Sequence, residues 1–124
     1  MIQTLAIAGG GAVGALLRFW VSTWVYARLG RDFPWGTLAV NVAGSLLMGL
    51  LYVLLIERLA VPPAWRAALL VGLLGAFTTF STFSIETFNL IEEGALLAAL
   101  ANVLLSVVLC LLGAWLGVWL GRMV

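Results

Sequence analysis

The sequence predicts an all-α integral membrane protein with four transmembrane helices, of which the third is broken. Of its 124 residues, 65% are hydrophobic and only 9% are charged, whereas soluble domains carry about 25% charged residues. The apolar residues form four runs, and each is long enough to cross a bilayer, which takes about 20 residues. Hydroxyl side chains interrupt the third run. These observations together predict the fold class.

Polar and turn-forming residues set the limits of a single membrane domain, 1–124. We expect spans at about residues 2–28, 34–56, 63–90 and 95–121. Pro63 suits the first turn of a helix, where its missing N–H costs nothing. Five tryptophans lie near the span ends, as is typical of the membrane interface: Trp20, Trp24, Trp35, Trp65 and Trp119. The loops are short, so neighbouring spans should be antiparallel.

The arginines give no clear orientation in the membrane. With four spans, one side carries Arg58, Arg66 and Arg122, and the other carries Arg28 and Arg31. Arg18 joins the second group if its side chain reaches the interface. Orientation follows an excess of basic residues on one side, and there is none here. We therefore expect insertion both ways and an antiparallel, dual-topology homodimer; the alternative is that weaker cues orient the chain.

Composition also excludes several classes of function. A net charge of +1 offers no electrostatic surface for nucleic acid, and the absence of histidine excludes a His-based metal or proton site. The one cysteine, Cys110, cannot form an intrachain disulfide and suits an apolar helix. No basic residue precedes the first apolar run, so we expect no cleaved signal peptide. With no nucleophile–base pair visible, we expect a multi-pass protein of the cell membrane that is not an enzyme.

Two ionisable residues lie inside the predicted spans, Arg18 in the first and Glu86 in the third. Such a group costs about 2.5 to 3.5 kcal/mol at a helix centre, which makes each a functional candidate. They could simply pair with each other or with the backbone near an interface. Alternatively, Arg18 lies at the mouth of an aqueous vestibule and attracts anions.

Two spans carry polar or small residues at four-residue spacing, which places them along one face of each helix. They are Thr37, Asn41, Ser45 and Gly49 in the second span, and Asn102, Ser106 and Cys110 in the fourth. An Asn inside a span needs partners, because lipid offers none. It could bond a neighbouring helix, or the two faces could line one narrow lumen.

Glycines at the same spacing predict close helix packing. Gly10 and Gly14 form a GxxxG pair in the first span, and Gly113, Gly117 and Gly121 extend along the fourth. Small residues allow helix backbones to touch in a membrane, so we assign these positions to packing and not to chemistry.

The segment 75–84, GAFTTFSTFS, contains the densest polar signal in the chain. Five hydroxyls lie within ten residues in the middle of a span. Hydroxyl and β-branched residues weaken a helix and offer its backbone other partners. We therefore expect a discontinuity between two half-helices, which is tolerated at that depth where it is buried in protein or lines a cavity. The alternative is an unbroken helix with hydroxyls bonded to the preceding turn.

This lining favours a small, hard anion. Aromatic ring edges are the positive part of the ring quadrupole, and Asn, Ser and Thr side chains donate hydrogen bonds. Donors and ring edges without a full positive charge can replace hydration and still release the ion.

The chain resembles the Fluc (CrcB) family of fluoride channels over essentially its whole length. The resemblance rests on GGGAVGALLRF, GTLAVNVAGS and GLLGAFTTFSTFSIE. It implies passive export of cytoplasmic fluoride through two antiparallel pores of a dual-topology homodimer, with one structural sodium ion (Na⁺) at the dimer centre.

The resemblance also implies roles for individual residues. The fluoride pore would comprise Asn41, Phe80, Phe83, Ser81, Thr82, Thr37 and Ser106. Gly75 and Thr78 would give backbone carbonyls to the sodium ion, and Arg18 and Glu86 would lie towards the vestibules. In the fourth span, where family members often have several hydroxyls, this chain has Asn102 and Ser106, followed by Cys110.

The sequence leaves a second function open, that of a proton-coupled small-cation antiporter of the small multidrug resistance type. Such a protein would also be a four-span dimer, and Glu86 could bind cation and proton in turn. Arg18 stands where that family would hold a glutamate, and the Phe/Thr repeat would then have no purpose.

Overall fold

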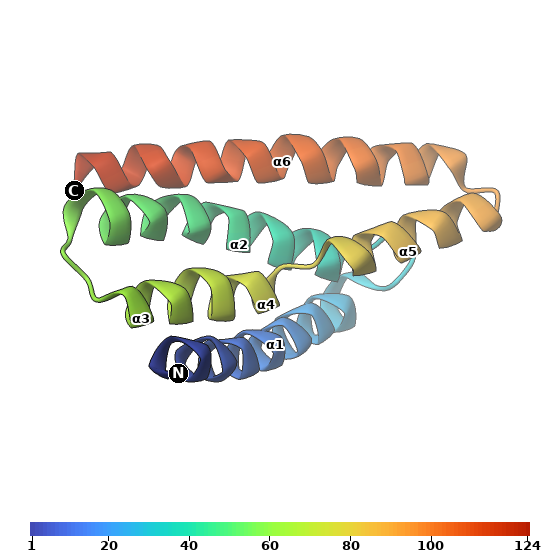
Figure 1. Ribbon diagram of the computed structural model, residues 1–124. Coiled ribbons are helices and arrows are strands. Elements are labelled where there is room, and N and C mark those ends of the chain that lie inside the picture. The colour runs from blue at the N-terminus through green and yellow to red at the C-terminus, as the bar shows by residue number, and fades with distance from the viewer.

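A computed structural model describes residues 1–124, and all of its regular structure is helical. Four helical stretches are long and apolar enough to cross a membrane, and they lie roughly alongside one another (Figure 1). The first span is α1 (Ile2–Leu29), and the second is α2 (Trp35–Tyr52) with its π-helical continuation η1 (Val53–Arg58). The third comprises α3 (Pro63–Arg66), the π-helical η2 (Ala67–Leu74), α4 (Gly75–Phe77) and α5 (Phe80–Glu92). The fourth is α6 (Leu96–Met123).

Short loops with turn residues end the helices. Gly30 and Gly94 adopt positive φ angles of 84° and 79°, which cost glycine little, and they follow α1 and α5. Pro63 occupies the first turn of α3. Both termini and the loop between η1 and α3 lie at one end of the molecule, and the other two loops lie at the opposite end (Figure 1). Consecutive spans therefore run in opposite directions.

Glycines allow the spans to pack backbone to backbone. A side chain at Gly14 would overlap the backbone of Leu73 in η2, and one at Gly117 would overlap the backbone of Leu46 in α2. Contact this close is the usual role of small residues in membrane helices. The packing role predicted for the two glycine series is thus seen on both sides of the bundle, where α1 meets η2 and α2 meets α6.

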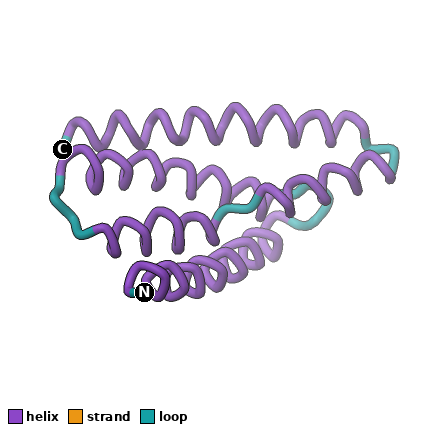
Figure 2. Tube along the Cα trace, viewed as in Figure 1, coloured by secondary structure: helices purple, strands orange, loops and turns teal.

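The third span is broken, as the hydroxyl-rich segment predicts. Thr78 and Thr79 have extended backbones, with ψ angles of 158° and 119°, and they separate α4 from α5. Figure 2 shows this interruption as a loop within the span. The Thr79 side chain then caps α5 by accepting a hydrogen bond from the backbone N–H of Thr82 at 3.2 Å. The alternative of an unbroken helix is therefore wrong.

The outer surface carries large apolar side chains along all four spans, among them Leu16, Phe19 and Leu104. Such a surface suits lipid as its solvent. The one ion pair, between Arg122 and Glu57 at 3.0 Å, is exposed and lies at the end of the bundle that holds the C-terminus. Exposed pairs contribute only about 0 to 1 kcal/mol, so packing and not charge holds the spans together.

Candidate functional site

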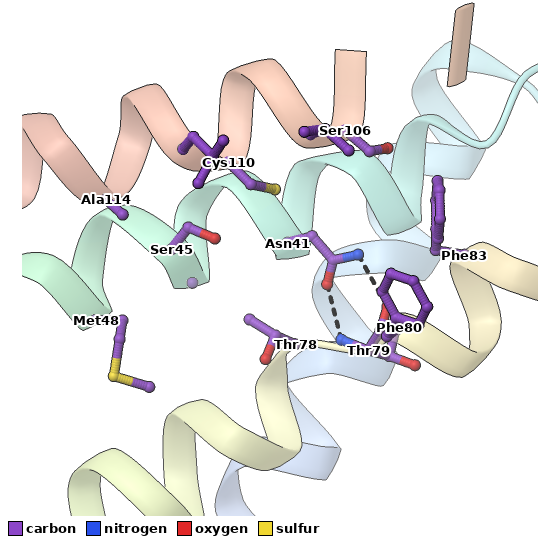
Figure 3. A pocket seen from close by; sticks show the side chains of 13 residues that line it. Asn41, Ser45, Met48, Thr78, Thr79, Phe80, Phe83, Ser106, Cys110 and Ala114 are labelled. Carbon is purple, nitrogen blue, oxygen red and sulfur yellow. Dashed lines mark hydrogen bonds between the residues drawn. The ribbon is translucent and has the colours of Figure 1, made fainter. Parts of the chain in front are cut away.

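A cavity of about 470 Å³ lies beside the break in the third span. The second and fourth spans and the break all contribute to its wall, as Figure 3 shows. The lining residues are Asn41, Gly44, Ser45, Met48, Thr78, Thr79, Phe80, Phe83, Ser106, Val107, Cys110, Leu111 and Ala114. The two polar helix faces found in the sequence thus meet at one cavity, through Asn41 and Ser45 on α2 and Ser106 and Cys110 on α6.

The side chain of Asn41 stabilises the break by bonding to the backbone of Thr79. Its Nδ2 donates to the carbonyl of Thr79 at 2.9 Å, and its Oδ1 accepts from the backbone N–H of Thr79 at 2.7 Å. In a continuous helix that N–H would donate to the carbonyl of Gly75, four residues earlier. Asn41 therefore replaces a backbone hydrogen bond with a pair of side-chain bonds from a neighbouring span (Figure 3). Its second amide hydrogen has no acceptor within the chain.

The break leaves backbone carbonyls without their usual donors. Because the Thr79 N–H bonds to Asn41, the carbonyl of Gly75 loses the amide that would pair with it in a helix. No hydrogen bond in the chain reaches the carbonyl of Thr78. Gly75 is exposed and Thr78 is half-buried. Free carbonyls on an unwound segment are a common way to coordinate Na⁺ in membrane proteins.

Two phenylalanine rings form the aromatic part of the wall. The ring centroids of Phe80 and Phe83 lie 5.2 Å apart, and their planes are inclined by 48°. Phe83 is buried, whereas 78% of Phe80 is exposed in the single chain. This tilted pair is intermediate between the stacked and the edge-to-face arrangements that aromatic rings prefer.

Not every residue predicted for the pore lies on this wall. The hydroxyls of Ser81 and Thr82 bond to Thr79 Oγ1 at 3.3 and 3.0 Å, at the start of α5. Thr37 lies one turn before Asn41, near the start of α2, where its hydroxyl donates to Glu86. The pore role of these three residues stays a prediction.

Glu86 lies in a second, more polar cavity of about 470 Å³, at the end of α5 away from the break. Its carboxylate accepts hydrogen bonds from Thr37 and from Tyr26 at the end of α1. Arg31 stacks over the ring of Tyr26 with 4.5 Å between its guanidinium carbon and the ring centroid. Glu86, on the third span, is therefore bonded to polar groups of the first and second spans.

Arg18 and Glu86 do not form the mutual pair that was one of the possibilities. The side chain of Arg18 makes no hydrogen bond or ion pair, and Arg18 lines neither cavity. That alternative is wrong for the single chain. The vestibule role of the two residues remains a prediction.

Sequence reasoning missed Tyr26 and Thr79 as parts of the polar network. Tyr26 ends the first span, Thr37 begins the second, and Glu86 is late in the third, so alternating span directions put all three at one membrane depth. The shared membrane depth of these three residues was therefore the signal that could have identified Tyr26. For Thr79, no signal separated it from the other hydroxyls, because its role depends on the approach of Asn41.

Comparison with known proteins identifies the family. Residues 5–118 match the family described as CrcB-like protein, Camphor Resistance (CrcB). A protein named "Fluoride-specific ion channel FluC" from Methylococcus capsulatus is 62% identical over 103 residues, covering 83% of this chain and 45% of the relative. Proteins of the same name from Magnetococcus marinus and Hydrogenovibrio crunogenus are 56% and 48% identical, covering 83% of this chain and 84% and 78% of the relatives.

The chain spans less than half of the Methylococcus capsulatus relative and most of the other two. All three relatives are named as ion channels, so the family is one of channels and not of enzymes, as the sequence predicts. The four apolar helices and this membership make the protein a multi-pass protein of the cell membrane. With 114 of its residues (5–118) matched and these relatives at 48 to 62% identity, the chain belongs to the CrcB family.

Proposed function

We propose that this chain forms a passive, fluoride-selective channel that lets cytoplasmic fluoride leave the cell. The observation that carries the proposal is the cavity at the break, where the Asn41 amide, the Ser106 hydroxyl and two phenylalanine rings meet. None of the lining residues carries a formal charge. An anion there would meet hydrogen-bond donors and ring edges, which can replace water without trapping the ion. The relatives' name supports fluoride as the ion.

We further propose that the channel works as an antiparallel, dual-topology homodimer with two pores. Phe80 lines the cavity and is 78% exposed in the single chain. Beside it, Ser45 has no side-chain hydrogen bond, and the carbonyl of Thr78 has none either. Polar groups open to lipid at this depth are costly, and a second copy would cover them. The even distribution of arginines supports insertion in both orientations.

A structural Na⁺ between the two copies fits the carbonyl oxygens that the break leaves free. The carbonyls of Gly75 and Thr78 would hold it, two from each subunit, because the break removes their helical donors. Bound there, the ion would offset the negative ends of four carbonyl dipoles. Asn41 contributes by keeping Thr79 extended, which keeps these carbonyls free.

Fluoride efflux from liposomes tests the proposed function. We expect liposomes that contain the purified protein to release fluoride rapidly to an ion-selective electrode, without an imposed proton gradient and with little release of chloride. The family match gives no support to the small-cation antiporter, which would instead couple transport to protons through Glu86. Fluoride release that requires a proton gradient would contradict the channel.

Phe80→Ala should lower the fluoride efflux rate by about tenfold. The substitution removes the ring and its pairing with Phe83; an aromatic pair contributes about 0.5 to 1.5 kcal/mol, and 1.4 kcal/mol corresponds to a factor of ten. The rate is measured with the same electrode at matched protein-to-lipid ratios. Phe19→Ala is the control, since Phe19 is an exposed ring on α1 that lines neither cavity. An unchanged rate for Phe80→Ala would remove the ring-edge argument.

A further inference from the structure

A buried polar chain joins α5 to α6 behind the wall of the first cavity. Asn102 on α6 is only 1% exposed. Its Nδ2 donates to the hydroxyl oxygen of Thr87 on α5 at 2.8 Å, and that hydroxyl donates to the carbonyl of Phe83 at 2.7 Å. The amide of the fourth span is therefore linked through one hydroxyl to the backbone of a cavity residue on the third.

The same amide reaches a cavity residue on its own helix. Ser106 Oγ donates to Asn102 Oδ1 at 3.4 Å, close to the outer limit for a hydrogen bond. A bond this long is weak, so the Ser106 hydroxyl can turn to an anion at low cost. Phe83 and Ser106 both line the cavity, and Asn102 is the residue that connects them.

Apart from the turn bond between the N–H of Ala95, the N-cap of α6, and the carbonyl of Leu90, the Asn102–Thr87 bond is the only hydrogen bond between α5 and α6. The two helices are in contact, and their buried apolar side chains include Leu90 on α5 and Ala99 on α6. The hydrophobic effect is non-directional, whereas a buried amide–hydroxyl bond favours one register because it requires a specific distance and angle. The separation of the Phe83 ring from the Ser106 hydroxyl therefore depends on this bond.

We infer that Asn102 is a positioning residue for the discrimination of fluoride from larger halides, an inference that rests on the proposed channel function. A small anion gives up more hydration energy and needs the ring and the hydroxyl close on either side. A larger anion passes more easily when the gap between the ring and the hydroxyl widens, because cavity size and donor placement affect ion selectivity. By holding α5 against α6, Asn102 keeps the gap narrow and acts through Phe83 and Ser106 without lining the cavity itself.

The test compares four variants with wild type: Asn102→Leu, Thr87→Val, the double variant, and Thr87→Ser. Asn102→Leu removes the amide at similar volume, and Thr87 keeps the Phe83 carbonyl as an acceptor. The double variant replaces both partners with apolar side chains, which can be nearly neutral for stability. Thr87→Ser retains the hydroxyl and is the matched control. Fluoride and chloride efflux from liposomes and the size-exclusion profile are measured for each.

We expect the fluoride-to-chloride efflux ratio to fall by about tenfold in Asn102→Leu and in the double variant, equivalent to about 1.4 kcal/mol. The fall should come mainly from faster chloride release. Thr87→Val should shift the ratio in the same direction, and Thr87→Ser should stay within about twofold of wild type.

Three results would overturn the inference while leaving the channel function intact. They are an unchanged ratio in a folded double variant, a ratio lowered by Asn102→Leu but restored in the double variant, and a double variant that does not fold. In each case the bond would serve packing or folding and not discrimination. A wild-type protein that releases no fluoride would instead overturn the proposed function, and this inference with it.

Discussion

Asn41→Leu should reduce fluoride efflux by about a hundredfold. The substitution removes both side-chain bonds to Thr79 and leaves its N–H and carbonyl without those partners. Each unsatisfied buried group costs about 1 to 3 kcal/mol, and about 2.8 kcal/mol corresponds to a factor of one hundred. The extended backbone at the break then loses its support, and the cavity beside it loses a donor. Efflux per reconstituted protein measures the effect.

Asn41→Asp separates the contributions of the two hydrogen bonds between Asn41 and Thr79. Aspartate keeps an oxygen that accepts from the Thr79 N–H, but it cannot donate to the Thr79 carbonyl when ionised. We expect a melting temperature between those of wild type and Asn41→Leu. Ser22→Ala is the control, because the Ser22 hydroxyl bonds only to carbonyls of its own helix, at Arg18 and Phe19. Wild-type efflux by Asn41→Leu would show that the break does not depend on this side chain.

Gly117→Val should prevent correct folding or destabilise the fold by about 3 kcal/mol. A Cβ at this position would overlap the carbonyl of Leu46, and backbone cannot move aside as a side chain can. Overpacking in a tight core costs about 1 to 3 kcal/mol, and this contact lies at the upper end because both sides are helix backbone. We expect less monodisperse protein on size exclusion and a lower melting temperature in detergent.

Gly9→Ala is the matched control for this prediction. A Cβ at Gly9 would meet nothing within 4 Å, and alanine is the better helix former by about 1 kcal/mol. The control should therefore fold at least as well as wild type. If Gly117→Val melts like wild type, α2 and α6 do not depend on direct backbone contact in the membrane.

The four spans and the break could be predicted because each depends on local properties of the chain. Apolar runs and the residues that interrupt them determine the spans, and the hydroxyl-rich segment determines where the third span weakens. The sequence placed the break within residues 75–84, and the structure narrows it to Thr78 and Thr79. The density of hydroxyl residues does not say which threonines have extended backbones, because the position of the break depends on the hydrogen bonds from Asn41.

The hydrogen-bond partners were harder to predict than the polar residues themselves. Asn41 was recognised as needing a partner, and bonding to a neighbouring span was one of the possibilities. That its partner is the backbone of Thr79 follows from the distance between α2 and the break, where a side chain at Gly44 would overlap the Thr78 methyl group. Such distances come from helix packing, which spacing along one span does not encode. The π-helical segments η1 and η2 had no signal in the sequence.

The bond between Asn41 and Thr79 joins residues 38 positions apart, which has a consequence for the order of assembly. A newly inserted third span can satisfy the Thr79 N–H only within its own helix, by pairing it with the carbonyl of Gly75. Docking of the second span exchanges that bond for two from Asn41. We therefore expect the third span to enter the bilayer as one continuous helix and to separate into two half-helices only when the second span docks against it. The cavity would then be the last part of the protein to form.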